Sequence, residues 1–226
     1  LGEYERSENM NSLGALFGVH FSDGVLAHPN KLGAPVVLCA SYTDEAVEKH
    51  SAFNRMQAWG YGVSVPTAVA LDYSQVKDFE VYPVLVTGDS AWIEHETKDM
   101  VDGEFVCNPA AGEKEGNYAV LINLSRKIGD KEQRIIISGD SDFITNEEFG
   151  LTRPGMEVNN FEVITGSFRW LSYDAYPIYT DRIGAIDNGI NLSGGWRVWI
   201  KLFFMILFPA FLVGTGVTII YRRQRK

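Results

Sequence analysis

The feature that most constrains this chain is an apolar run close to its C-terminal end. Residues 202–221 read LFFMILFPAFLVGTGVTIIY, twenty residues without an acidic or basic side chain. A helix of that length is about 30 Å long, which matches the hydrocarbon core of a bilayer. The sequence therefore predicts a transmembrane helix, placed at residues 199–221, rather than a core helix of a soluble domain.

Charge is distributed unevenly on the two sides of this run. From Arg197 to the end there are six basic residues and no acidic one, whereas residues 1–196 hold 14 basic and 29 acidic residues. Positive charge beside a span is retained in the cytoplasm, and tryptophan prefers the interface. We therefore expect a cytoplasmic basic tail at residues 222–226, an extracytoplasmic acidic segment, and Trp196 and Trp199 at the outer interface. Membrane lipid is then a partner, and the formal charge of −15 on residues 1–196 argues against nucleic acid.

The residues before the span divide into a domain and a connector. We expect an extracytoplasmic α/β domain at residues 1–172 and an irregular connector at residues 173–198. Runs rich in valine, isoleucine and tyrosine, bounded by glycine, proline and acidic residues, predict strands. The expected strands are residues 36–40, 63–71, 79–87, 118–124 and 135–138. Capping residues and apolar spacings predict helices at residues 7–17, 45–59, 143–149 and 159–172.

Strands that alternate with helices are typical of an α/β sandwich with a largely parallel sheet. In the last expected helix, Phe161, Ile164, Phe168 and Leu171 recur at spacings of three and four, which indicates the face that packs on the sheet. The first helix starts six residues after Leu1 with no strand before it. We therefore expect the domain to start upstream of Leu1 and the sheet of this chain to have an open edge.

The leading candidate site is the loop Gly139-Asp140-Ser141-Asp142, directly after the last expected strand. Open α/β sheets bind ligands at the carboxyl ends of their strands. Two carboxylates at this spacing could bind Mg²⁺ or accept a phosphoryl group, and the loop superficially resembles the DxD loop of haloacid-dehalogenase-like phosphatases. Those enzymes need a downstream lysine, and the next one is Lys201 at the membrane boundary. The favoured interpretation is that Asp140 and Asp142 bind turn and helix N-terminal amides.

Other residues with chemical potential give weaker signals. His20, Asp23 and His28 lie in HFSDGVLAH, which has no helical histidine pair, so surface or core histidines are favoured over a metal site. Cys39 and Cys107 allow one disulfide, although the apolar surroundings of Cys39 favour a buried thiol.

Enzyme motifs do not occur in the sequence, and two glycosylation sequons do. There is no GxSxG elbow, no local signature of a thiol enzyme and no GxxxxGK[ST] phosphate loop, so we expect no catalytic residue and no cofactor. Asn123 and Asn191 each begin an N-L-S sequon, which has no meaning in a bacterial protein.

Several segments together resemble the GldG-type auxiliary proteins of ABC transporters, a family associated with gliding motility in some bacteria. The segments are ENMNSLGALFGVHFSDGVL, IIISGDSDFITN, NNFEVITGSFRWLS and the terminal span with YRRQRK. The resemblance covers most of the chain and is most specific from Gln133 onward.

This resemblance implies a three-layer α/β sandwich of the class I glutamine-amidotransferase-like type, incomplete at its N-terminus, outside the inner membrane of a bacterium. It also implies an export-type permease as partner, either as a subunit or as spans upstream in the same polypeptide, and a cytoplasmic ATPase as indirect partner. No catalysis is implied, because Asp140, Ser141 and Asp142 stand where amidotransferases carry a nucleophilic cysteine. Gly139, Asp140, Asp142 and Asn146 match the recurring loop of the family and are the expected ligand-binding residues.

Two other functions stay open: a single-pass extracytoplasmic receptor for a ligand or glycan, and a membrane-tethered hydrolase that uses the Asp140 and Asp142 loop.

Within the span, Ala210, Gly214 and Thr218 recur every four residues. Small side chains on one stripe let another helix approach closely. We therefore expect this stripe to pack against a permease helix.

Overall fold

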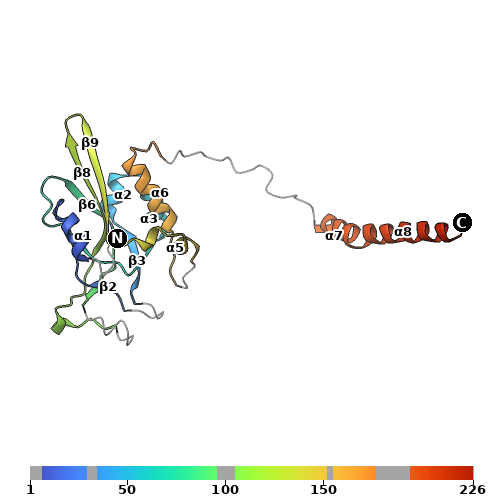
Figure 1. The fold of residues 1–226 in the computed structure, drawn as a ribbon, viewed down its shortest axis with the longest axis horizontal. Helices are drawn as coiled ribbons and strands as arrows, with labels where there is room; N and C mark the ends of the chain where they lie inside the picture. The colour runs from blue at the N-terminus through green and yellow to red at the C-terminus, as the bar shows by residue number, and fades with distance from the viewer. Residues whose placement is uncertain (1–6, 30–34, 96–104, 152–154, 177–193, 226) are drawn as a thin grey trace. The chain divides into compact units, whose positions relative to one another are not determined.

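The computed structural model describes residues 7–29, 35–95, 105–151, 155–176 and 194–225 (Figure 1). The chain forms two units, Leu1–Tyr179 and Thr180–Lys226. The first unit is a mixed α/β domain, and the part of the second unit that the structure describes is one long apolar helix.

The centre of the first unit is a five-stranded sheet with the order β4-β3-β6-β8-β9. Its strands are β3 (Val37–Tyr42), β4 (Val63–Pro66), β6 (Glu80–Val86), β8 (Ala119–Ile128) and β9 (Lys131–Ser138). The apolar runs that predicted strands all contribute to this sheet. β8 extends four residues past the predicted end, because its second half pairs with β9 in a hairpin.

The expectation of a largely parallel sheet was wrong. Every neighbouring pair of strands in this sheet is antiparallel. Between β8 and β9 lie only Gly129 and Asp130, and Gly129 has a φ of 61°. A two-residue turn with positive φ reverses the chain, whereas parallel strands need a crossover of a dozen residues or more. The pairing of these strands therefore does not confirm the amidotransferase-like fold.

Two small antiparallel sheets flank the central one. β1 (His20–Phe21) pairs with β5 (Leu71–Asp72), and β2 (Val25–Ala27) pairs with β7 (Trp92–Glu94). The predicted strand at residues 63–71 is thus two strands, β4 and β5. Thr67 interrupts it with a φ of 54°, a conformation that cannot continue a strand.

Helices cover both faces of the central sheet, as Figure 1 shows. On one face α1 (Ser7–Gly14) packs with Phe17, Phe21 and Ile122 in one apolar cluster. On the other face α2 (Asp44–Lys49) and α6 (Asn160–Leu171) pack with Phe53, Tyr82 and Trp170 in a second cluster. The strands β6, β8 and β9 thus contribute side chains to two separate cores, whereas β3 and β4 contribute only to the core of α2 and α6.

The helix predicted at residues 45–59 is two helices, α2 and α3 (Asn54–Trp59). Thr43 caps α2, and its hydroxyl accepts the N–H of Ala46 at 3.1 Å. His50 then adopts an extended conformation with φ −150°, and its Nδ1 accepts the N–H of Ala52. This break lets Phe53, 1% exposed, turn into the core.

The second unit is a continuous helical segment made of α7 (Gly194–Leu202), a π-helical turn (Phe203–Leu207) and α8 (Phe208–Gln224). The stretch Val198–Gln224 is long and apolar enough to cross a membrane, in agreement with the predicted span. Pro209 lacks an N–H and would clash with the carbonyl four residues earlier. The preceding π turn, in which the N–H of Phe208 bonds to the carbonyl of Phe203, is the local structure that accommodates it.

Candidate functional site

The α/β unit carries an apolar groove of about 740 Å³, which we call the β9 groove. One wall comes from α1 and the residues after it, and the other comes from α6. The floor is β9, and the loop after β9 closes one end with η3 (Asp142–Ile144) and α5 (Asn146–Gly150). The lining residues are Met10, Leu13, Gly14, Phe17, Phe21, Leu121, Ile135–Ser138, Asp140, Ser141, Phe143, Ile144, Phe149, Ile164, Ser167, Phe168 and Leu171.

The side of α6 that sequence spacing assigned to the core is largely a surface, and its residues Ile164, Phe168 and Leu171 line this groove. Phe161, Phe168 and Leu171 are exposed to solvent, and Ile164 is only half-buried. The buried positions of the helix are Asn160, Val163, Gly166 and Trp170. Gly166 allows a close approach of Phe53, since an added Cβ would lie 3.0 Å from its ring. The more apolar stripe of α6 is therefore a surface.

Asn160, which sequence analysis did not single out, holds α6 in this orientation. Its Oδ1 accepts the N–H of Ser64 at 2.9 Å, and its Nδ2 donates to the carbonyls of Ser64 at 2.8 Å and Phe143 at 3.0 Å. The side chain is 4% exposed. The side-chain amide of Asn160 thus joins β4, α6 and the end of the groove. In the sequence, an asparagine at the start of a helix gives no sign that it connects elements in this way.

The loop Gly139-Asp140-Ser141-Asp142 lies at the end of β9, as predicted. Gly139 donates its N–H to the carbonyl of Val120 and accepts the N–H of Val69 at 2.9 Å. A Cβ at Gly139 would lie 2.0 Å from the carbonyl oxygen of Val69. This glycine is therefore required by the close approach of two backbones, and it is not among the residues that line the groove.

The two aspartates of the loop have different roles. Asp140 is 2% exposed, and its Oδ1 accepts the N–H of Asp142 at 2.8 Å, which is the amide-binding role favoured from the sequence. Its Oδ2 is buried and has no hydrogen-bond partner. Asp142 begins the η3 turn and is half-buried, and Asn146 is exposed in the first turn of α5, which Thr145 caps. Of the four expected ligand-binding residues, the structure brings only Asp140 into the groove.

The environment of Asp140 favours its neutral form. Burial raises its pKa to about 7, and the carboxylates of Asp142 and Glu148 act in the same direction. The N–H groups of Asp142 and Phe143 oppose this by binding the ionised form. A neutral Asp140 carries an O–H, which is a hydrogen-bond donor, and Ser138, Ser141 and Ser167 are the other polar residues that line the groove.

The other candidates of the sequence are separated or buried. Among the described residues, no three His, Cys, Asp or Glu side chains are grouped so that they could hold a metal ion, and the Nε2 atom of His28 contacts the Val37 carbonyl at 3.1 Å.

Cys39 and Cys107 are free thiols, and burial raises the pKa of Cys39. Asn123 is fully buried and donates to the hydroxyl of Tyr82, so the folded domain cannot carry a glycan there. Asn191 lies outside the described residues.

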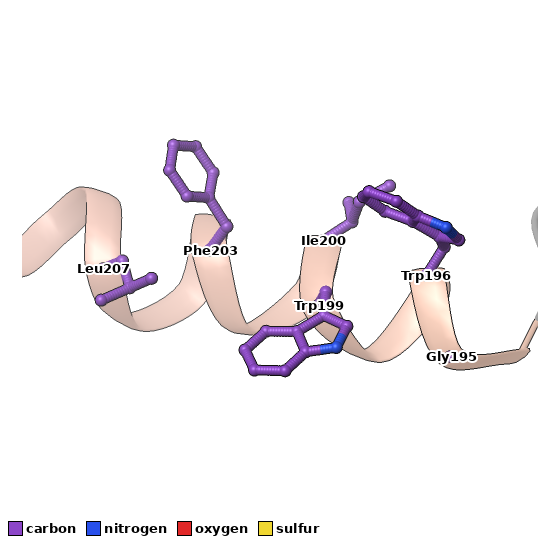
Figure 2. A pocket seen from close by; sticks show the side chains of 6 residues that line it. All are labelled: Gly195, Trp196, Trp199, Ile200, Phe203 and Leu207. Atoms are coloured by element: carbon purple, nitrogen blue, oxygen red, sulfur yellow. The ribbon is translucent and has the colours of Figure 1, made fainter.

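The apolar helix of the second unit has an aromatic N-terminal end. Figure 2 shows Trp196, Ile200 and Phe203 along one side of it and Trp199 on the other, around an open hollow of about 710 Å³. Farther along, the hydroxyl of Thr218 donates to the carbonyl of Gly214 at 2.7 Å, and a Cβ at Gly214 would meet no atom within 4 Å. No contact among the described residues of this helix therefore requires a glycine at that position.

Together the observations define an apolar groove with one buried carboxyl group, on a domain whose chain also carries a helix able to span a membrane. The groove provides shape and apolar contact, and Asp140 provides one polar atom. Comparisons with protein-family models, with curated proteins and with solved structures find no match for this chain.

Proposed function

We propose that the chain is a non-catalytic auxiliary subunit of an ABC-type export system in the inner membrane of a bacterium. The α/β unit lies in the periplasm, α8 crosses the membrane, and the basic tail lies in the cytoplasm. The partners are a permease, as a separate subunit or as upstream spans, and a cytoplasmic ATPase that contacts the chain only indirectly.

The observation that carries this proposal is the apolar helix with its charge asymmetry. Val198–Gln224 is long and apolar enough to cross a membrane, and Arg222, Arg223 and Arg225 crowd its C-terminal end. A span retains such charges on the cytoplasmic side. At the other end, Trp196 and Trp199 are exposed, as suits side chains that lie at an interface.

The auxiliary role follows from the resemblance to GldG-type proteins and from the chemistry of the groove. A hydrolase needs a nucleophile and a base within hydrogen-bond reach of each other. In the described part of the groove the only carboxylic side chain is Asp140, next to serines and apolar residues. This composition suits binding, and the membrane-tethered hydrolase is the less favoured alternative.

Cysteine labelling tests the orientation. In a Cys39→Ala, Cys107→Ser background, Ala110→Cys places a probe on the exposed turn Pro109–Ala111, and Arg225→Cys places one at the other end of the span. A membrane-impermeant maleimide should label the Ala110→Cys chain in intact spheroplasts and the Arg225→Cys chain only after lysis. The reverse pattern would refute the proposed topology.

Co-purification tests the transporter. The tagged full-length chain, cross-linked in native membranes and purified, should carry a multispan permease and a protein with a GxxxxGK[ST] loop. Recovery of the chain alone would contradict the export function while leaving the topology intact.

The β9 groove favours a second candidate, a single-pass receptor module. A volume of about 740 Å³ is in the range of ligand-binding clefts. The upstream gene sequence separates the two functions: several apolar spans before Leu1 or an adjacent ATPase gene supports the transporter, and a lone signal peptide supports the receptor.

A further inference from the structure

The floor of the β9 groove is a sheet edge. β9 is the last strand in the order β4-β3-β6-β8-β9 and pairs only with β8 among the described strands. The hydroxyl of Tyr173 donates to the carbonyl of Glu132 at 2.6 Å, so the backbone of Glu132 faces away from β8. Because backbone direction alternates along a strand, Arg134, Ile136 and Ser138 also direct their N–H and C=O groups outward.

The outer edge divides into a covered half and an open half. At the covered half, the end of α6 lies against β9, with Tyr173 on Glu132 and the Arg134 guanidinium bonded to the carbonyl of Trp170. At the open half, the outward backbone groups of Ile136 and Ser138 bond to no backbone group of the described residues. Unpaired edge groups of this kind are a template for another strand.

The groove follows this open edge rather than one face of the sheet. A pocket on one face would be lined by every second residue of a strand, whereas Ile135, Ile136, Ile137 and Ser138 all line the groove. Ile136 belongs to the core cluster of α6, and Ile135 and Ile137 belong to that of α1. The space beside β9 is therefore enclosed by the helical layers of both faces.

These walls define what fits between them. A strand added to β9 would be apolar on both faces, since Phe168 and Ile164 meet one face and Leu13 and Phe17 meet the other. Four residues of strand span about 13 Å and would cover Ile135–Ser138. A helix, about 10 Å wide and with its backbone groups already bonded, would leave the edge of β9 unpaired.

The sequence itself does not provide such a strand. Runs of four or more consecutive apolar residues occur at residues 36–40, 68–71 and 118–122 and in the C-terminal helix. The first three are already in the sheets and core of the α/β unit. A second copy is disfavoured, because its β9 has only three such residues, and its own α1 and α6 would meet those of the first copy.

We propose that β9 accepts an extended peptide strand, apolar over about four residues, from outside these 226 residues. The added strand pairs with the outward backbone groups of Ile136 and Ser138 and is held between α1 and α6. This is strand addition at a sheet edge, in which backbone bonds give affinity and the side-chain walls give selectivity. It rests on the groove alone and is independent of the transporter proposal.

The probe is a lysine-flanked peptide with the core Val-Ile-Val-Ile, added to the full-length chain in lipid nanodiscs. The control peptide has the same side chains but N-methylated backbone nitrogens at alternate positions, which removes its donors on the pairing side. Fluorescence anisotropy measures binding, and residue-resolved hydrogen exchange follows the amides of Ile136 and Ser138.

The protein variants are a matched pair on α6. Phe168, 59% exposed, lines the groove, and Phe161, 60% exposed on the same helix, does not. We expect Phe168→Glu to weaken peptide binding at least tenfold and Phe161→Glu to change it less than twofold. Exchange at Ile136 and Ser138 should slow at least tenfold when the unmethylated peptide binds, and the methylated peptide should leave it unchanged.

Four results would overturn the proposal. Equal binding of both peptides would show apolar contact without strand pairing. Slow exchange at Ile136 in the free monomer would show that this chain already covers the edge. A stable dimer with protected Ile136 would identify a second copy as the occupant. Fast exchange that no peptide changes would show that the edge does not accept a strand.

Discussion

Replacement of Asp140 by asparagine should make the α/β unit more stable at neutral pH, and the gain should depend on pH in a defined way. Asparagine is isosteric with a neutral aspartic acid. Its Oδ1 can keep the bond from the N–H of Asp142, and its Nδ2 replaces the buried Oδ2 that has no partner. The variant thus imitates the protonated form of Asp140 at every pH.

The magnitude follows from linkage between ionisation and folding. In the folded chain the pKa of Asp140 is about 7 against an ordinary 3.8, so between these values only the unfolded chain releases the proton. The folded state then binds more protons than the unfolded state, and stability falls by about 1.4 kcal/mol for each pH unit. The free energy of unfolding of the wild-type chain is therefore highest below pH 4 and is lower by about 4 kcal/mol once the pH has risen to 7. The Asp140→Asn chain does not lose this stability, because its side chain does not ionise.

Urea unfolding of the full chain in nanodiscs, followed by the fluorescence of buried Trp92 and Trp170, measures the effect. The stability of Asp140→Asn relative to wild type should rise by about 4 kcal/mol from pH 4 to pH 7.5. Asp130→Asn, which removes an exposed carboxylate from the β8–β9 turn, should follow the wild-type profile. A difference between Asp140→Asn and wild type that stays constant within ~1 kcal/mol across this range would refute the argument that Asp140 is neutral and buried.

Three further substitutions probe other parts of the chain. Asn160→Leu leaves three buried backbone groups without partners and should lower the free energy of unfolding by about 3 kcal/mol or more, measured by urea unfolding. Gly139→Ala places a Cβ against the carbonyl of Val69 and should cost at least ~2 kcal/mol in the same assay; a neutral effect would contradict the close approach. Gly214→Leu should abolish co-purification of the proposed permease without impairing membrane insertion, whereas Leu212→Ala should retain it.

Much of the sheet could be predicted from the sequence, because β-branched runs such as Ile135–Ile137 favour strands wherever they occur. The direction of the strands could not, because it depends on the connections. The predicted strands end at residue 124 and resume at residue 135, whereas β8 and β9 are separated only by Gly129 and Asp130. Only the two-residue length of the turn makes the antiparallel hairpin necessary.

The orientation of α6 shows a different limit. Spacing correctly predicted an amphipathic helix, and the more apolar side was assigned to the core. The core is determined instead by fit: Gly166 allows Phe53 to approach, and Asn160 supplies three hydrogen bonds. An apolar stripe identifies the side of a helix that avoids water. That side can be part of the core or part of a binding surface.

The candidate site was predicted at Asp140 and not beyond it. The loop was found because it follows a strong strand, and its amide-binding role was anticipated. The groove was not, since its walls come from α1 and α6, which are separated by more than a hundred residues. A single sequence gives no signal of such long-range proximity.

The π turn at Phe203–Leu207 has a geometric consequence for the span. Such a turn holds about one residue more than an α turn, and one residue of an α-helix corresponds to about 100° of rotation. The side chains of α8 are therefore rotated about the helix axis by roughly a quarter of a turn, compared with an uninterrupted continuation of α7. The direction of Trp196 and Trp199 relative to the stripe of Ala210, Gly214 and Thr218 is therefore fixed by this offset. In the proposed topology, a neighbouring helix that docks on Gly214 would also determine which way Trp196 and Trp199 face among the lipid headgroups.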